Sequence, residues 1–225
     1  MSKSNVKYED LYSISPETNN QEKAFELWDN GDNLVLAGSA GTGKTFVALY
    51  LALESVLERD TPYHKVIIVR SVVPIRDMGF LPGTLEEKKE VFETPYKAIC
   101  TQLFNDDKAY NKMINNHQIE FTTTSYIRGL TIDNAIVIVD EMQNLNFHEL
   151  DSVITRVGEN CRIIFSGDYY QSDFTRDDEK DGLQRFLRIV EQLKNFGVIT
   201  FNWHDIVRSD FLRDYIMTKE MLGLK

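Results

Sequence analysis

The chain has 225 residues, of which 42% are hydrophobic and 11% aromatic. This composition is typical of a globular protein of one domain and excludes a disordered chain. The formal net charge of −10 argues against a generally cationic protein that binds nucleic acid over its whole surface, although a local basic groove stays open.

The N-terminal residues are polar, and we expect residues 1–15 to form a flexible segment ahead of a single domain over residues 16–225. Pro16 follows Ser15, a pattern typical of a helix start. It predicts a helix that runs to about residue 30.

Short apolar runs predict the strands of a sheet. They lie at residues 33–37, 65–70, 135–139, 162–165 and 198–201. Apolar residues are consecutive in these runs rather than alternate, so we expect strands that are covered on both faces. That pattern indicates a mostly parallel sheet with helices on each side.

Longer segments between these runs predict helices, at residues 44–59, 145–157 and 181–195. The alternation of strands and helices predicts one doubly wound α/β domain. The interval from 71 to 134 is longer than one crossover needs. Within it we expect a helix from Thr84 to Phe104, a polar helix or loop over 105–116, and a short extra strand over 119–123.

The first strand run leads into a P-loop motif, G-x-x-x-x-G-K-[ST]. It reads Gly38-Ser39-Ala40-Gly41-Thr42-Gly43-Lys44-Thr45. Backbone N–H groups of such a loop, with the positive end of the next helix, surround a nucleotide phosphate. We expect Lys44 to contact the β- and γ-phosphates and the Thr45 hydroxyl to ligate Mg²⁺. The alternative is a Gly-rich turn that only joins a strand to a helix.

Two carboxylates, Asp140 and Glu141, follow the strand run at 135–139. We expect Asp140 to hold magnesium and Glu141 to orient and polarise the attacking water, which favours hydrolysis of ATP over transfer to another metabolite. The alternative is a solvated strand end. After the run at 162–165, Asp168 and Gln171 are candidates to face the γ-phosphate, or else belong to a plain Gly-Asp turn.

Taken together, these segments resemble the PhoH-like family of P-loop ATPases, which is related to the first motor domain of superfamily 1 helicases. The likeness covers residues 18–217. It rests on residues 18–21, 38–45, 69–70, 79–83, 126–129, 139–144, 155–158, 167–173 and 205–208. The resemblance implies a RecA/helicase-like P-loop fold.

The resemblance also implies roles for single residues. Gln21 resembles the helicase glutamine that reads the adenine edge, and Gln143 and Gln171 resemble couplers to the γ-phosphate. Arg208 resembles an arginine that stabilises charge on the transferring phosphoryl group. The family resemblance implies a homo-oligomeric ring, a hexamer, in which Arg208 reaches a neighbour's ATP. From the residues alone, a surface arginine near a C-terminal helix is the better explanation of Arg208.

Two functions remain open. The first is an ATPase that remodels RNA or single-stranded DNA. Its candidate phosphate contacts are Arg70, Arg76, Arg128 and Arg156. The second is an ATP-dependent assembly or regulatory protein without a nucleic-acid substrate, which the acidity favours. A small-molecule kinase is the weakest candidate, because Glu141 indicates water as the acceptor.

The remaining features point to a soluble cytoplasmic protein. Cys100 and Cys161 form no metal or disulfide pattern, and the four histidines are scattered, so we expect no metal other than magnesium. No apolar run approaches the ~20 residues of a membrane span, and no signal peptide is evident.

Overall fold

The computed structural model describes residues 5–71, 85–127, 129, 131–168 and 177–223. Within them, six parallel strands form one sheet in the order β3-β2-β4-β5-β1-β6. The strands are β1 (Asn33–Gly38), β2 (Lys65–Arg70), β3 (Ile119–Thr123), β4 (Ala135–Val139), β5 (Cys161–Gly167) and β6 (Phe196–Phe201). The predicted doubly wound parallel fold is therefore confirmed.

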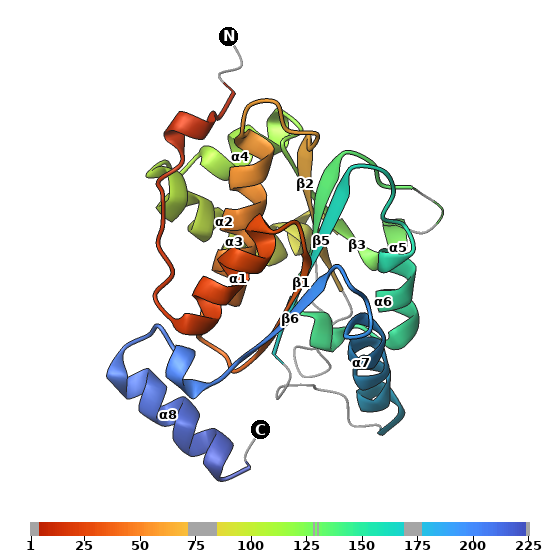
Figure 1. Ribbon diagram of the computed structural model, residues 1–225. Helices are drawn as coiled ribbons and strands as arrows, with labels where there is room; N and C mark the ends of the chain where they lie inside the picture. The colour runs from red at the N-terminus through yellow and green to blue at the C-terminus, as the bar shows by residue number, and fades with distance from the viewer. Residues whose placement is uncertain (1–4, 72–84, 128, 130, 169–176, 224–225) are drawn as a thin grey trace.

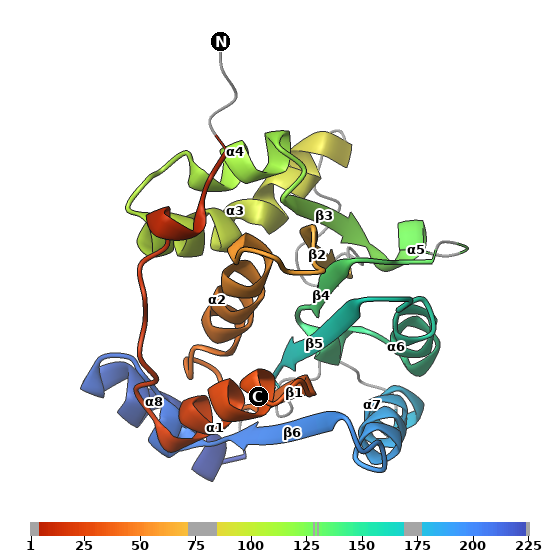
Figure 2. The same cartoon turned by 45° about the horizontal axis from the view of Figure 1, so that its top comes forward.

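Eight α-helices occur in the described part of the chain. They are α1 (Asn19–Asp29), α2 (Lys44–Leu57), α3 (Leu85–Phe104), α4 (Ala109–Asn115), α5 (Thr124–Ile127), α6 (Phe147–Ile154), α7 (Asp177–Val190) and α8 (Asp210–Met221). Three short 3₁₀ helices join them: η1 (Tyr8–Asp10), η2 (Met142–Asn144) and η3 (Trp203–Asp205). Figures 1 and 2 show α1, α2 and α3 on one side of the strands and α6 and α7 on the other.

The strands are buried on both faces, as the consecutive apolar runs predict. In β1, Leu34 and Leu36 pack into the core under α1 and α2, while Val35 and Ala37 pack into the core under α6 and α7. Successive side chains of a strand point to opposite faces, so a strand between two helical layers needs apolar residues at every position.

The helix bounds differ from the predicted ones in several places. The first helix begins at Asn19 and not at Pro16, because the Thr18 side chain caps it by accepting from the Gln21 N–H. The helix predicted at 44–59 ends at Leu57. The helix predicted at 145–157 is α6, shortened because its start is fixed by a capping box in which Asn146 and Glu149 bond each other's backbone N–H groups. Residues 142–144 form the separate turn η2. The helix predicted at 181–195 lies earlier in the chain, at 177–190.

The N-terminal segment, expected to be flexible, is packed onto the domain over its described part. Val6 is buried, and its carbonyl accepts from Gln118 Nε2 at 2.9 Å. The Tyr12 N–H donates to the Leu103 carbonyl at 2.8 Å. Figure 1 shows this segment running past α3 and α4 before it enters α1. These contacts bring Ile14 and Ser15 close to the carboxyl end of β1, where they line the cavity described below.

Candidate functional site

The P-loop joins β1 to α2 at the carboxyl edge of the sheet, and its glycines permit a shape that other residues would not. Gly41 and Gly43 have φ of +77° and +80°, in the left-handed region that favours glycine. Gly38 has φ +132°, and a Cβ on it would overlap the Phe201 carbonyl of the neighbouring β6. The chain therefore folds tightly back on itself ahead of α2.

Lys44, the first residue of α2, places its ammonium group inside this loop. Its Nζ donates to the carbonyls of Gly38 and Ser39 at 3.0 and 2.6 Å, and to Thr42 Oγ1 at 3.3 Å. Burial lowers the pKa of Lys44, an effect that the neighbouring carboxylates of Asp168, Glu141 and Asp140 oppose. The loop thus holds a desolvated cation that an incoming anion can attract from the loop carbonyls.

Thr45 and Asp140 meet across the sheet, from the start of α2 and the end of β4. The Thr45 hydroxyl donates to Asp140 Oδ1 at 3.0 Å, and the Tyr96 hydroxyl of α3 donates to Asp140 Oδ2 at 2.7 Å. Asp140 is only 3% exposed. Sequence reasoning missed Tyr96, since its helix was predicted but nothing in the sequence showed which face would meet the sheet.

Glu141 has a left-handed backbone, with φ 53° and ψ 44°, a conformation that costs a non-glycine residue about 1 kcal/mol or more and is typical of functional sites. Its Oε2 accepts from Gln143 Nε2, and its Oε1 lies 3.8 Å from the Arg70 guanidinium. Burial, with the adjacent Asp140 carboxylate, raises the pKa of Glu141 above its ordinary value. A carboxylate with a raised pKa is a better proton acceptor.

Gln143 links Glu141 to the end of β5. Its Oε1 accepts from the backbone N–H of Asp168 at 2.9 Å, and its Nε2 donates to Glu141. A Cβ on Gly167 would overlap Gln143 Oε1, so glycine leaves the room that this bond requires. Gln143 therefore joins the ends of β4 and β5 in one hydrogen-bond network.

Gln21 of α1 lies against the P-loop and is 5% exposed. Its Nε2 donates to the Thr42 carbonyl at 3.1 Å, and its Oε1 accepts from the Glu17 N–H at 2.8 Å. In this structure its amide braces the loop from outside.

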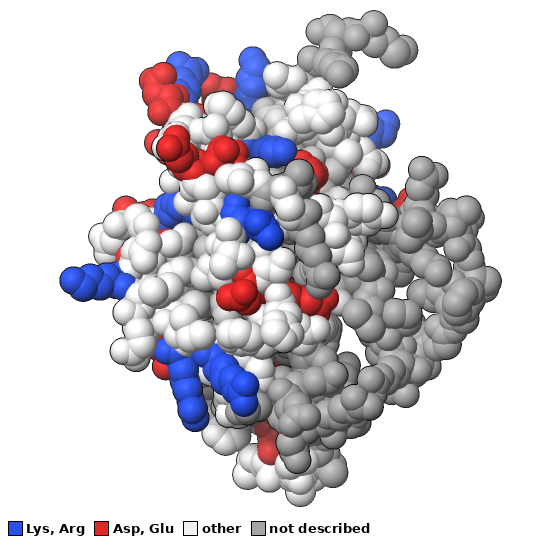
Figure 3. All heavy atoms as spheres, turned by 90° about the vertical axis from the view of Figure 1, so that its right-hand side faces the viewer, with Lys and Arg blue, Asp and Glu red and all other residues white. Residues whose placement is uncertain are grey.

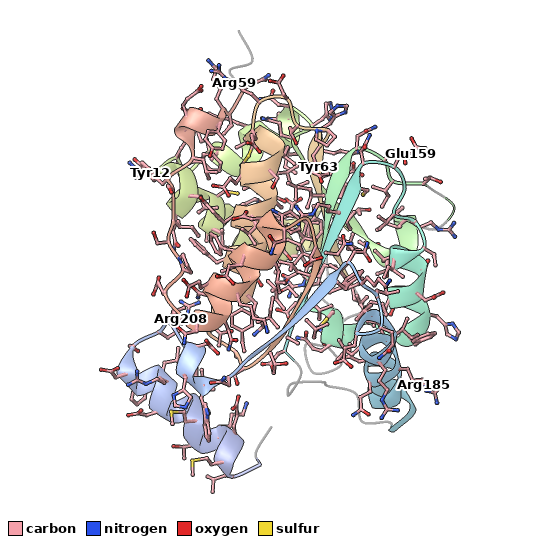
Figure 4. The ribbon with its side chains drawn as sticks, in the orientation of Figure 1. Tyr12, Arg59, Tyr63, Glu159, Arg185 and Arg208 are labelled. Atoms are coloured by element: carbon pink, nitrogen blue, oxygen red, sulfur yellow. The ribbon has the colours of Figure 1, made fainter. Side chains whose placement is uncertain are left out.

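The segment after β6 closes another side of the loop. The Val207 N–H donates to the Gly41 carbonyl at 3.1 Å. A Cβ on Gly41 would lie 3.3 Å from Arg208 Cγ and 3.5 Å from Ile216 Cδ1 of α8. Figure 4 shows Arg208, an exposed residue, between α1 and α8, at the opposite end of the molecule from Arg59.

A cavity of about 700 Å³ lies over these groups, a size that suits a nucleotide. Beside P-loop residues 40–45, it is lined by Asp140, Glu141, Asp168 and Arg208. Further lining side chains include Ile14 and Ser15 of the N-terminal segment, Phe46 of α2, and Pro95, Ala98, Ile99 and Gln102 of α3. The contributions of the N-terminal segment and α3 were not predicted.

Two of the four candidate arginines, Arg70 and Arg156, lie in the described part of the chain. Arg70 faces the site, where its guanidinium lies 5.4 Å from the centre of the Phe92 ring. Arg156 is half-buried beyond α6, and its Nε finds no hydrogen-bond partner among the described residues. Arg76 and Arg128 lie outside the described residues, as does Gln171.

The chain resembles known proteins over most of its length. The family model described as PhoH-like protein matches residues 13–219. A PhoH-like protein of Synechocystis sp. is 31% identical over 208 residues, covering 92% of this chain and 62% of the relative. Protein PhoH2 of Bacillus subtilis is 38% identical over 173 residues, covering 73% of this chain and 38% of the relative. Protein PhoH of Escherichia coli K12 is 33% identical over 177 residues, covering 76% of this chain and 48% of the relative. The chain thus spans less than two thirds of each relative.

A solved structure shares the fold. The large terminase of a thermophilic bacteriophage has a TM-score of 0.51 at 13% identity, covering 92% of this chain and 50% of that one. Unliganded Pif1 from Bacteroides sp. has a TM-score of 0.45 at 15% identity, and the alignment covers 94% of this chain and 48% of that one. In the described part of the chain, no helix has the length and apolarity needed to cross a membrane.

Proposed function

Because this chain belongs to the PhoH-like protein family, we propose that it binds ATP at the P-loop and hydrolyses it with magnesium. The observation that carries the proposal is the contact of Thr45 with Asp140 at 3.0 Å, beside Lys44 and Glu141. A plain Gly-rich turn would not need a hydroxyl, two carboxylates and a desolvated lysine around one loop.

The donor groups suit magnesium. The Thr45 hydroxyl and the Asp140 carboxylate offer hard oxygen atoms, which Mg²⁺ prefers, and nucleotide phosphates commonly supply further ligands. The described residues include no group of three or more His, Cys, Asp or Glu side chains that could hold a metal ion through side chains alone. A magnesium ion held by these residues would neutralise charge on the phosphate oxygens of the nucleotide.

The chain's own residues supply the rest of the proposed chemistry. Lys44 leaves the Gly38 and Ser39 carbonyls and pairs with phosphate oxygens, while the P-loop N–H groups bind the same anion. Glu141 orients a water molecule and accepts its proton, with Gln143 fixing the direction of the carboxylate. Asp168 contributes a third acidic group at the cavity, beside Asp140 and Glu141, and Arg208 stabilises charge on the phosphoryl group.

We further propose that the hydrolysis is coupled to remodelling of RNA or single-stranded DNA. The family's relation to helicase motor domains supports this proposal. On the face shown in Figure 3, which bears α5, α6 and α7, the described Lys and Arg side chains are scattered among acidic ones.

One observation favours the alternative, an ATP-dependent assembly without a nucleic-acid substrate. Helix α8 has no buried residue, although it lies against the P-loop. Four of its large apolar side chains are exposed: Phe211, Leu212, Tyr215 and Met221. A subunit that covered α8 would also approach Arg208, as in the proposed hexameric ring, and ATP occupancy would then affect assembly.

Turnover of ATP by the purified protein tests both proposals, measured with and without single-stranded RNA or DNA over a series of salt concentrations. Light scattering on the same samples reports the assembly state.

Lys44→Ala and Glu141→Gln should each lower turnover by ~100-fold or more, as loss of charge-stabilising or base groups commonly does. Stimulation by nucleic acid that weakens with salt supports remodelling. Turnover that depends on assembly but not on nucleic acid supports the alternative, and an assembled protein without turnover contradicts the catalytic proposal.

A further inference from the structure

Helix α3 reaches the acidic end of β4 through one buried side chain. Tyr96 is 1% exposed, and its hydroxyl donates to Asp140 Oδ2 at 2.7 Å. The other carboxylate oxygen, Oδ1, accepts from the Thr45 hydroxyl at 3.0 Å. Each oxygen of this carboxylate therefore has a hydroxyl donor of its own.

These two bonds fix the orientation of the Asp140 carboxylate. Rotation about its Cβ–Cγ bond would break both, and a buried carboxylate oxygen that loses its donor is costly. Hydrogen bonds to an ionised acceptor are also stronger than neutral ones. With Tyr96 in place, Oδ1 stays directed at Thr45, the pairing that the proposed magnesium site requires.

Tyr96 itself is held firmly. Its ring packs against Phe121 of β3 with centroids 5.9 Å apart. Phe92, about one turn earlier in α3, lies under the Arg70 guanidinium, which in turn lies 3.8 Å from Glu141. The same helix thus contacts Asp140 directly and Glu141 through Arg70.

We infer that Tyr96 is a positioning residue for the metal-binding carboxylate, holding Asp140 in the orientation in which its Oδ1 and the Thr45 hydroxyl receive the magnesium of a bound nucleotide. This rests on the proposed function. Tyr96 acts through Asp140 and takes no part in the reaction itself. Partners that orient a metal ligand typically change metal affinity by ~10–100-fold when removed.

Tyr96→Phe tests the inference, since it removes the donor and keeps the ring. The matched control is Tyr50→Phe, because the buried Tyr50 also donates its hydroxyl to a carboxylate, Glu54 Oε1, at 2.6 Å, and that carboxylate belongs to no proposed metal site. The readout is binding of a fluorescent, non-hydrolysable ATP analogue, titrated with Mg²⁺ and repeated in EDTA. Thermal melting of each variant establishes that it is folded.

In Tyr96→Phe, the Mg²⁺ concentration for half-maximal enhancement of binding should rise about tenfold, while binding in EDTA stays within about twofold of wild type. Tyr50→Phe should change neither quantity. In an Asp140→Asn background, Tyr96→Phe should add no further change in the Mg²⁺ requirement.

An unchanged Mg²⁺ requirement in Tyr96→Phe, with a wild type that shows normal metal-enhanced binding, overturns the inference alone. A similar loss of binding in EDTA overturns it too, because Tyr96 would then serve the fold and not the metal. A further tenfold change in the Asp140→Asn background contradicts action through Asp140. A wild type without metal-enhanced binding overturns the proposed function, and this inference with it.

Discussion

The guanidinium of Arg70 and the carboxylate of Glu141 lie 3.8 Å apart at the carboxyl ends of two neighbouring strands, β2 and β4. Their side chains are 17% and 36% exposed, so solvent screens the pair only partly. Burial and Asp140 raise the pKa of Glu141 above its ordinary value of 4.5, and Arg70 opposes this rise. Arg70 therefore helps to keep the proposed base ionised.

This relationship predicts the effect of Arg70→Ala on the pH dependence of turnover. Without the guanidinium the pKa of Glu141 rises further, so the acid limb of kcat should move to higher pH. Measurement of kcat at saturating ATP over a pH series checks this. Arg156→Ala serves as the control and should leave the limb in place. A limb that stays or moves to lower pH in Arg70→Ala would contradict the electrostatic role.

The same raised pKa predicts that Glu141→Gln stabilises the protein at neutral pH while it removes activity. A carboxyl group with a folded-state pKa above the unfolded one binds its proton more tightly in the folded state. Its stabilising contribution is complete below pH 4.5 and is lost as the pH rises through the raised pKa. We therefore expect a higher Tm for Glu141→Gln than for wild type at pH 7, with the difference closing toward pH 4.5. If wild type and Glu141→Gln had equal Tm values at pH 7 and also at pH 4.5, burial of the Glu141 charge would have no cost in stability.

Gln21→Ala should weaken the binding of ATP and of GTP equally, whichever nucleobase the nucleotide carries. In the structure both ends of the Gln21 amide are engaged, with the Thr42 carbonyl and the Glu17 N–H, and its removal loosens the P-loop. Loss of two such bonds, each of about 1 kcal/mol, should lower the affinities for ATP and GTP by roughly 30-fold alike. Competition binding with both nucleotides measures this. A loss confined to ATP would favour the adenine-reading role that the helicase resemblance implies.

Much of the fold follows from the sequence because strands buried on both faces leave consecutive apolar runs. The runs at 65–70 and 135–139 are β2 and β4 with the same bounds. Lys44, Thr45, Asp140 and Glu141 could be placed together because carboxyl ends of parallel strands share one edge of the sheet.

The unpredicted parts of the site depend on tertiary contacts. Tyr96 and Asp140 are separated by 44 residues, and no local pattern shows that this face of α3 meets the end of β4. Arg70 was interpreted as a contact for nucleic acid on the surface. The sequence around an arginine at a strand end does not show whether its side chain faces solvent or pairs with a buried carboxylate. The left-handed backbone of Glu141 is likewise imposed by its surroundings, since glutamate has no preference for it.

Gly167→Ala should uncouple the end of β5 from Glu141. The added methyl would overlap Gln143 Oε1 and lie 2.7 Å from Met142 Cγ, so Gln143 must move and lose its bond from the Asp168 N–H. We expect a destabilisation of ~1–3 kcal/mol, as for other overpacked sites, and a fall in kcat larger than the loss of ATP affinity. Chemical denaturation and steady-state kinetics measure the two effects. Gly182→Ala is the control, because its methyl would lie 3.2 Å from the nearest atom, the backbone N of Phe147, a residue outside the Gln143 network. If Gly182→Ala lowered kcat as much as Gly167→Ala, the network through Gln143 would have no special part in hydrolysis.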